Sequence, residues 1–396
     1  MFEVRPARPE EMDEFRRVAG TALVMKPSVF EFVRPDWTLC GVEESGLCTT
    51  LGTLPLNLVI NGVSSPVSGV TSVGSLPVSR RRGHLRRVMA RHFEMMHEKG
   101  EQHIAALWAS WAAIYQRFGY GLVATRLSYA VEPRYIQFAE AKPATGTLRE
   151  AGDSDAALIE ELYGKFVAER TGYIARARGM WQYGVMYAPP VGGTLSKVIY
   201  EEAGKPQGYI IYHTQQLPAD PIPNHKLLVR DLVWLNSRAY CTFWEHLSSM
   251  DLIQEIDWPR APSDDPLPHL LLEPRRLRAA AYDSILARLV TVEKALTQRR
   301  YTEEGDLTFD LTDAMCPWNT GRWRLEATIG GSRVTRTRKA ADIELPVGTL
   351  ALLLFGQVSA TEAARMGRLD AKRAEALAAW DRVMRTMYKP ACPDMF

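Results

Sequence analysis

The spacing of hydrophobic and polar residues changes between residues 67 and 100, and the change predicts a strand followed by a helix. The stretch Val67–Val73 has the apolar, β-branched character that strands favour. After Gly83 the apolar residues recur at helical spacing and share one face: Leu85, Val88, Met89, Phe93 and Met96. The pair Lys99–Gly100 then predicts the end of the helix.

Four arginines and a glycine lie at the N-terminus of this helix: Arg80, Arg81, Arg82, Arg86 and Gly83. A helix N-terminus attracts anions because its first N–H groups are free and its dipole is positive there. Gly74 and Pro77 predict an irregular, bulged strand end whose unpaired backbone groups a ligand could use. By itself an arginine run is more often a solvated surface, and this turn matches neither the Walker loop nor G-x-G-x-x-G.

The patterns divide the rest of the chain into blocks. The first block ends near residue 145, where proline, glycine and threonine cluster. The second begins with a predicted helix at 155–172 and continues with predicted strands at 197–202, 208–214 and 227–235 and a helix at 240–250. The third has predicted strands on both sides of the turn Pro317–Gly321 and a closing helix over 359–387, which Ser359 and Glu362 begin as a capping box.

Composition and charge favour an ordinary globular protein of 396 residues, with 46% hydrophobic and 24% charged residues. A net charge of +2 argues against nucleic-acid binding, which depends on neutralising phosphates. The longest apolar run, Leu350–Gly356, is too short to span a bilayer, and the N-terminus does not resemble a secretory signal. Five scattered cysteines without a C-x-x-C pair, and His92 and His97 five residues apart, predict a reduced cytoplasmic protein with no metal site.

Motifs in order along the chain resemble those of the enhanced intracellular survival (Eis) family of GCN5-related N-acetyltransferases (GNAT). They are the Val73–Arg86 segment with Pro77 and RRRG, the ASWAAIYQRFGYG segment Ala109–Gly121, DPLPHLL at Asp265–Leu271, and a final phenylalanine, Phe396. The resemblance implies an α/β (α+β) fold with tandem GNAT-like domains and a C-terminal sterol-carrier-like α/β domain. The implied domains are 1–145, which binds acetyl-CoA and is catalytic, 146–285, which has no cofactor site, and 286–396, which ends in the catalytic C-terminus.

The family's activity implies an acetyl-CoA-dependent N-acetyltransferase and a role for each matching residue. Tyr115 would be the general acid, and the terminal carboxylate of Phe396 would be the base. The implied contacts with acetyl-CoA are Val73, Gly74, Ser75, Arg81, Arg82, Gly83, His84, Leu85, Arg86, Ser110 and Trp111. A phenol suits the acid's task because its pKa of about 10 lies near that of a thiol, about 8.5. Without the resemblance, a buried core tyrosine and a frayed terminus are the simpler interpretations.

Three positions depart from the family's pattern, and they bear on the acceptor more than on the reaction. Trp111 follows Ser110 where the family often has an acid, Ser72 replaces a bulky aromatic, and Met395 replaces a glutamate. Glu31, Asp36, Ser72 and Met395 are the residues expected to contact the acceptor, although surface solvation is the better explanation for each of the two acids. The predicted acceptor is a polyamine, an aminoglycoside first, processed by direct transfer.

Two alternatives remain open beside this prediction. One is lysine acetylation on a protein or peptide, and the other is a lipid-binding carrier without catalysis. The family also implies a homohexamer, a trimer of dimers, with no nucleic-acid or membrane partner.

Overall fold

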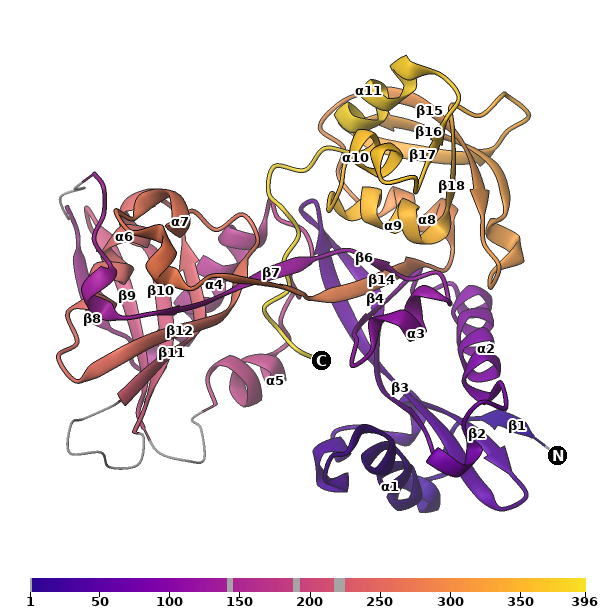
Figure 1. The fold of residues 1–396 in the computed structure, drawn as a ribbon, viewed down its shortest axis with the longest axis horizontal. Helices are drawn as coiled ribbons and strands as arrows, with labels where there is room; N and C mark the ends of the chain where they lie inside the picture. Colours follow the sequence, from indigo (N-terminus) through magenta and orange to yellow (C-terminus); the bar gives the residue numbers. More distant parts are fainter. Residues whose placement is uncertain (1, 141–144, 188–192, 217–224) are drawn as a thin grey trace. The chain divides into compact units, whose positions relative to one another are not determined.

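The computed structural model describes residues 2–140, 145–187, 193–216 and 225–396 (Figure 1). Its contacts group the chain into two compact units. Unit 1 comprises Met1–Ala124, Ser284–Thr386 and Asp394–Phe396, and unit 2 comprises Thr125–Asp283 and Met387–Pro393. None of the helices in the described ranges is long and apolar enough to cross a membrane.

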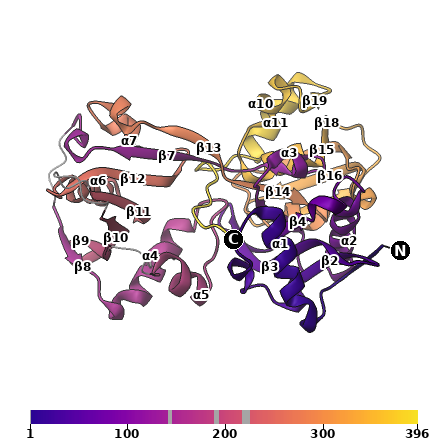
Figure 2. The same ribbon diagram turned by 60° about the horizontal axis from the view of Figure 1, so that its bottom comes forward.

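Unit 1 contains a seven-stranded sheet in the order β1-β2-β3-β4-β5-β14-β6. Its strands are β1 (Glu3–Arg5), β2 (Thr38–Glu43), β3 (Gly46–Ile60), β4 (Val63–Ser75), β5 (Ile104–Trp108), β6 (Gly121–Leu122) and β14 (Ile285–Leu289). The helices of this part are α1 (Met12–Leu23), α2 (His84–Lys99) and α3 (Ala112–Gln116). Both views place α3 beside β14 and β4 (Figures 1 and 2). The strand and helix predicted in Val67–Gly100 are therefore confirmed as β4 and α2.

The helices α1 and α2 cover opposite faces of this sheet, as the alternation along β2 requires. Leu39 packs with the apolar face of α2, whereas its neighbour Cys40 packs with α1. On β4, Val70 also belongs to the core under α2. Gly74 faces the other way, and a Cβ there would lie 2.4 Å from Cβ of Ala22 at the end of α1. Glycine at this position therefore lets α1 approach the strand.

Unit 2 contains a second seven-stranded sheet, in the order β13-β7-β12-β11-β10-β9-β8. Its strands are β7 (Thr125–Val131), β8 (Thr147–Glu150), β9 (Leu195–Glu202), β10 (Lys205–Gln215), β11 (His225–Trp234), β12 (Ile253–Pro262) and β13 (Ala280–Asp283). Its helices are α4 (Ala156–Val167), α5 (Arg178–Met180), α6 (Ser237–Ser248) and α7 (Leu267–Leu270). These bounds confirm the helices and strands predicted for the second block.

The two sheets have the same strand arrangement, but they exchange one strand. Counted from β1, the sixth strand of the unit 1 sheet is β14, which follows the second block in sequence. Counted from β8, the sixth strand of the unit 2 sheet is β7, which precedes that block. A boundary at 145 thus assigns β7 to the first domain, although it pairs in the sheet of unit 2. The division 1–145, 146–285 and 286–396 stays a prediction, and residues 141–144 of the expected linker lie outside the described ranges.

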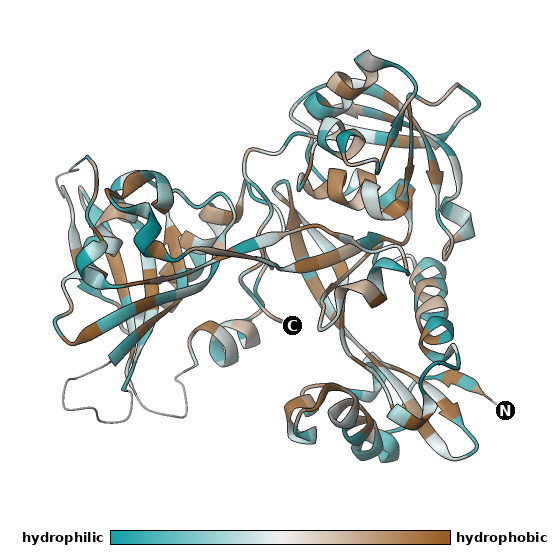
Figure 3. Ribbon diagram, in the orientation of Figure 1, coloured by the Kyte–Doolittle hydropathy of each residue, from teal (hydrophilic) through white to brown (hydrophobic). Residues whose placement is uncertain are grey.

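The third block forms a five-stranded sheet in the order β17-β16-β15-β18-β19. Its strands are β15 (Gly305–Thr312), β16 (Gly321–Thr328), β17 (Gly331–Arg336), β18 (Ile343–Pro346) and β19 (Asp370–Ala371). Its helices are α8 (Val292–Thr297), α9 (Val347–Phe355), α10 (Ala360–Arg365) and α11 (Ala374–Val383). All nine residues of α9 are buried, and Figure 3 shows the helix as largely hydrophobic.

One helix prediction for the third block is wrong. The segment 359–387 was expected to be a single helix, but it contains α10, the short strand β19 and α11. The capping box of Ser359 and Glu362 is present at the start of α10. The helix ends because Gly367 adopts φ +69°, a left-handed conformation that terminates helices. The predicted strands around Pro317–Gly321 are confirmed as β15 and β16.

Candidate active site

The strands β4 and β5 separate and leave a wedge between them. They pair in parallel only at Ser68–Ala105 and Gly69–Ala106, although β4 continues to Ser75. Beyond Gly69 the backbone groups of β4 that face β5 therefore have no ladder partners there. Such groups are free to bind a polar ligand that enters the wedge.

A bulge in β4 lies at the open end of this wedge. Thr50 pairs with Gly74 and Gly52 with Thr71, so that Ser72 and Val73 together face a single residue of β3. Ser72 has φ +52°, and its carbonyl accepts a hydrogen bond of 2.8 Å from the Thr50 hydroxyl. The Ser72 hydroxyl is buried without a hydrogen-bond partner among the described residues. The predicted irregularity is confirmed, whereas Pro77 lies beyond it, in the short 3-10 helix Pro77–Ser79.

The N-terminus of α2 is shaped to receive an anion. Gly83 is its N-cap with φ +79°, and no side chain caps the helix. A Cβ on Gly83 would have no heavy atom within 4 Å, so the space beside the N-cap residue is open. The predicted phosphate-binding turn therefore combines a helix N-terminus that no side chain caps with open space beside it, and both features favour an anion.

The charged side chains around this turn divide into three groups. Arg81 and Arg86 are exposed and have no ion pair in the part of the chain that the structure describes. Arg80 donates instead to the Ser75 carbonyl at 3.1 Å. Arg82 and His84 both point to Glu43, at 3.1 and 2.8 Å. The hydrogen bond from His84 is the main reason that the pKa of Glu43 lies below its usual value.

Glu43 is a site residue that the sequence did not reveal, since it lies at the end of β2, about forty residues before the arginines. Together with Cys48 and His84 it forms a group whose potential ligand atoms lie within 4.8 Å of one another. Cys48 already donates to the Gly41 carbonyl at 3.3 Å. The expectation of no metal site stays a prediction.

Tyr115 lies on α3, and Ser110 and Trp111 lie in the short connection between β5 and this helix. The Trp111 side chain is 69% exposed, whereas Tyr115 is 8% exposed, and burial raises the pKa of Tyr115 to about 12. Its hydroxyl has no hydrogen-bond partner among the described residues. Tyr120 packs edge-on against it with ring centres 5.9 Å apart, and the Tyr120 hydroxyl is buried with no hydrogen-bond partner in the described part of the chain. Tyr115 is therefore the more available acid of the two.

A buried ion pair supports the turn that follows Tyr115. Arg288 on β14 donates to the Phe118 carbonyl and, at 2.6 Å, to the carboxylate of Asp313. Asp313 in turn accepts hydrogen bonds from Asn319 and from the backbone of Met315 and Cys316. Both charged residues come from distant parts of the sequence, and no local pattern indicated either of them.

The end of the chain packs into unit 1 at the point where the wedge opens. The indole N–H of Trp108, the last residue of β5, donates to the Asp394 carbonyl at 2.8 Å. A Cβ on Gly69 would lie 3.1 Å from the ring of Phe396, so this ring covers the glycine. Met395 is 64% exposed. The last three residues are thus attached to the strands that form the wedge, which is unlike a frayed tail.

The structure does not bring the predicted acidic residues to this place. Asp36 pairs with Arg34 and lines a cavity of about 220 Å³ together with Ser68 and His92. Ser68 hydrogen-bonds His92 of α2 and points to the face opposite Gly69, because neighbouring strand residues alternate. Asp36 therefore lies on the α2 face, away from Phe396. Glu31 is exposed, and no contact among the described residues places it at the wedge.

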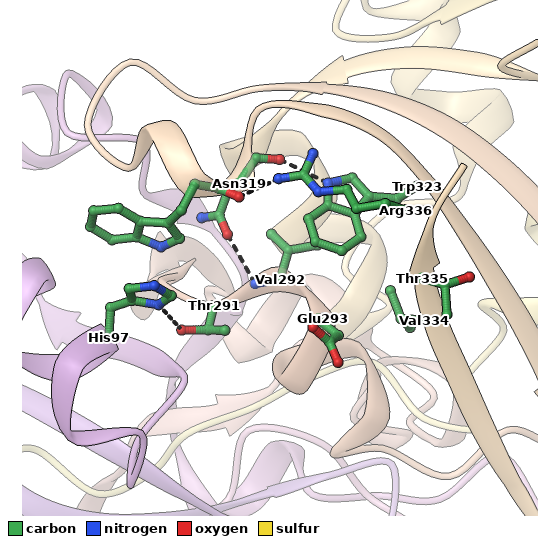
Figure 4. Close-up of a pocket in the computed structure, with 10 residues that line it drawn as sticks. His97, Thr291, Val292, Glu293, Asn319, Trp323, Val334, Thr335 and Arg336 are labelled. Carbon is green, nitrogen blue, oxygen red and sulfur yellow. Dashed lines mark hydrogen bonds between the residues drawn. The ribbon is translucent and has the colours of Figure 1, made fainter. Parts of the chain in front are cut away.

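Another cavity, of about 360 Å³, lies at the far end of α2 (Figure 4). His97 stacks on Trp318 with ring centres 4.5 Å apart, and Arg336 covers the ring of Trp323 at 3.8 Å. None of the predicted site residues lines this cavity.

Models of known families match three successive parts of the chain. Residues 3–123 and 172–289 each match an acetyltransferase (GNAT) domain, and residues 292–393 match a sterol carrier protein domain. These matches and the three sheets confirm the predicted fold class.

Curated relatives and solved structures agree with this order of domains. An uncharacterized N-acetyltransferase of Streptomyces avermitilis is 32% identical over 85% of this chain and 84% of its own length. The N-acetyltransferase Eis of Mycobacterium tuberculosis is 29% identical over 82% of this chain and 79% of its own length. The crystal structure of Eis1 from Mycobacterium abscessus aligns over the full length of both chains with a TM-score of 0.83 and 27% identity. A GCN5-related N-acetyltransferase from Anabaena variabilis aligns equally completely, with a TM-score of 0.87 and 22% identity, which shows a shared fold.

Proposed function

Because the chain belongs to the Eis family of GCN5-related N-acetyltransferases and is an acetyl-CoA-dependent acyltransferase, we propose that it acetylates an amine of a polyamine, with aminoglycosides as the first candidates. The observation that carries the proposal is the wedge between β4 and β5, with the bulge at Ser72–Val73 and the uncapped N-terminus of α2. Acetyl-CoA has a pyrophosphate for the helix and a thioester for the bulge, so one ligand satisfies both features.

The donor would lie along β4. The first N–H groups of α2 at His84, Leu85 and Arg86, with the charges of Arg81 and Arg86, would bind the pyrophosphate. Glu43 holds Arg82 and His84, so these two residues would shape the turn more than neutralise the phosphates. The backbone of Val73, Gly74 and Ser75 would bind the pantetheine arm, and Ser110 and Trp111 would close the groove. The bound thioester supplies the acetyl group, and an unpaired N–H at the bulge would stabilise the negative charge that develops on its oxygen.

The chemical step would be a direct transfer. The neutral amine attacks the thioester carbon and forms the C–N bond, and the C–S bond then breaks. The carboxylate of Phe396 would accept the amine's proton, and the Tyr115 hydroxyl would give a proton to the departing thiolate. The raised pKa of Tyr115 keeps it protonated at neutral pH, as an acid must be.

The acceptor would reach the wedge on the face of the sheet where Phe396 covers Gly69. The unpaired Ser72 hydroxyl and the exposed Met395 are candidates to contact it. Glu31 remains a weaker candidate, and Asp36 is disfavoured by its position on the α2 face. We also propose that the enzyme is a homohexamer that acts in the cytoplasm, as the family implies. Five buried cysteines, none of which forms a disulfide among the described residues, agree with a reducing compartment.

The test is thiol release from acetyl-CoA with a panel of aminoglycosides and with lysine peptides. Two variants separate the carboxylate from the ring: an extension by two glycines moves the carboxylate and keeps the ring, and Phe396→Leu keeps the carboxylate and shortens the side chain. Loss of turnover only in the extended enzyme supports the terminal base, whereas equal turnover in the extended and unmodified enzymes contradicts it. Turnover with lysine peptides alone would assign the enzyme to protein acetylation. Co-purified lipid without any turnover would contradict catalysis and favour a carrier.

A further inference from the structure

The sheet of unit 2 repeats the wedge of unit 1. Strands β11 and β12 pair in parallel from His225–Ile253 to Leu228–Asp257 and then separate. Asp231 and Val229 pair with consecutive residues of β10, which leaves Arg230 as the extra residue of a bulge. The bulge thus lies just beyond the point of separation, as it does in β4. Unit 2 therefore retains the backbone geometry that opens a binding groove.

The end of this wedge is not shaped for a pyrophosphate. Strand β11 ends at Trp234 and α6 begins at Ser237, so only two residues join them, whereas Leu76–Gly83 joins β4 to α2. The Asn236 side chain caps α6 by accepting a hydrogen bond of 2.8 Å from the Ala239 N–H. A capped helix with so short a connection offers an anion neither free donors nor room.

The C-terminal tail occupies the wedge of unit 2. Pro393 lines a cavity together with residues of both separated strands, among them Arg230 and Asp231 of β11 and Trp258 and Arg260 of β12. The cavity that remains measures about 10 Å³, roughly what a single water molecule needs. Ala391 and Cys392, which precede Pro393, are buried to 4% and 3% exposure. The groove is thus filled by this chain.

Specific contacts hold the tail in unit 2. The Ala391 N–H donates to the Thr171 carbonyl at 3.0 Å, and the Lys389 N–H donates to the Asp264 carboxylate at 2.8 Å. The guanidinium of Arg170 lies 3.9 Å from the centre of the Tyr388 ring. Gly172 has φ +91°, and a Cβ there would lie 2.8 Å from the Ala391 carbonyl oxygen, so its glycine makes room for the tail.

We infer that the wedge of unit 2 is a docking slot for residues 388–393 of the same chain, and that docking there positions the last three residues for catalysis. Pro393 and Asp394 are joined by a peptide bond, so a fixed Pro393 limits where the terminal carboxylate can go. The positioning part of this inference rests on the proposed role of Phe396. The second GNAT domain would then have a task of its own, which is to hold a catalytic group of the first.

Thiol labelling tests the docking without any assay of activity. All five cysteines are buried, so iodoacetamide should modify the native protein slowly, and Cys392 as slowly as Cys241 in α6. Ala391→Asp places a carboxylate in the slot and should expose Cys392 alone, because burial of an unpaired charge is unfavourable. The matched control Met387→Asp adds the same group at a position that is 71% exposed and should leave Cys392 protected. Peptide mass spectrometry identifies the labelled residue.

Two labelling results would overturn the inference. The first is modification of Cys392 in the native protein as fast as in the urea-unfolded chain. The second is a Cys392 that stays protected in Ala391→Asp. Should Ala391→Asp also expose Cys241 and so unfold unit 2, the milder variant Asp264→Ala decides, since Asp264 is exposed and its carboxylate accepts the hydrogen bond from the Lys389 N–H. Faster labelling of Cys392 in Asp264→Ala than in the control Asp251→Ala then supports docking, and equal labelling overturns it.

Kinetics test the positioning. In the variant that releases Cys392, kcat should fall on the order of tenfold to a hundredfold with an unchanged KM for acetyl-CoA, because small misplacements of a reacting group are costly. The Met387→Asp control should keep its kcat. Release of Cys392 without loss of kcat would overturn the positioning, whereas the role of Phe396 is tested separately by the two-glycine extension. If the native enzyme turned over no amine but the labelling pattern held, the proposed function would fail and the docking slot would stand.

Discussion

Asp313→Ala is expected to destabilise unit 1 by about 3–5 kcal/mol, because it leaves a buried guanidinium without its counter-ion. The Arg288 side chain is 0% exposed and that of Asp313 is 1% exposed, so water cannot replace the lost partner. The backbone N–H groups of Met315 and Cys316 lose their acceptor as well. A loss of this size is a large part of the 5–15 kcal/mol by which a domain is typically stable.

The assay is urea unfolding followed by tryptophan fluorescence, with Asp306→Ala as the matched control. Asp306 lies on β15 and pairs with Arg324, but its side chain is 48% exposed, so its removal should cost about 1 kcal/mol or less. Replacing both partners, as Arg288→Met with Asp313→Leu, should recover part of the loss, since no unpaired charge then remains. A midpoint for Asp313→Ala equal to that of Asp306→Ala would refute the reasoning.

The same variant should affect catalysis. Arg288 holds the Phe118 carbonyl, three residues after Tyr115. At a temperature where Asp313→Ala is fully folded, kcat should fall while the KM for acetyl-CoA stays near the native value, because the substitution changes no residue of the bulge or of the α2 N-terminus. An unchanged kcat in the folded variant would restrict the ion pair to a role in stability.

Three further predictions concern single residues. Tyr115→Phe should lower kcat by about 10²–10⁴-fold without changing the thermal midpoint, because the hydroxyl has no partner in the described ranges. If the native enzyme lost activity with rising pH already below about pH 10, and Tyr115→Phe did not show that loss, the pKa of about 12 would be contradicted. Gly83→Ala and Gly100→Ala each impose a similar strain of about 1–2 kcal/mol at the two ends of α2, where φ is +79° and +65°. Only Gly83→Ala should raise the KM for acetyl-CoA, and equal KM values in the two variants would count against the phosphate site. Burial lowers the pKa of His92 to about 4, below its unfolded value of about 6.5, so its contribution of up to about 3 kcal/mol to the free energy of unfolding is complete above pH 6.5 and is lost as the pH falls towards 4. In His92→Gln the urea midpoint should therefore depend less on pH over this range, and the same pH dependence as in the native protein would contradict the assignment.

Local patterns in the sequence were sufficient for the elements of the donor site. The helical spacing after Gly83, the stop at Gly100 and the irregular strand end near Gly74 concern residues that are neighbours in the chain, and all three are present in the structure. Motif resemblance extended this to the family and the order of the domains. The prediction of a single closing helix over 359–387 was wrong for a local reason too, since the left-handed conformation of Gly367 ends the helix despite a composition that favours helices.

The tertiary structure alone decided which distant residues meet. Glu43 reaches Arg82 because β2 ends beside the start of α2, and Arg288 reaches Phe118 because β14 enters a sheet formed otherwise by residues of the first block. The contact of Pro393 with the wedge of unit 2 likewise depends on the arrangement of strands and not on a local pattern in the sequence. The periodicity of hydrophobic residues indicates how a segment folds and which face it buries. It does not indicate the partner strand, since any apolar face can cover another. Strand exchange, the supporting ion pair and the docked tail therefore became visible only in three dimensions.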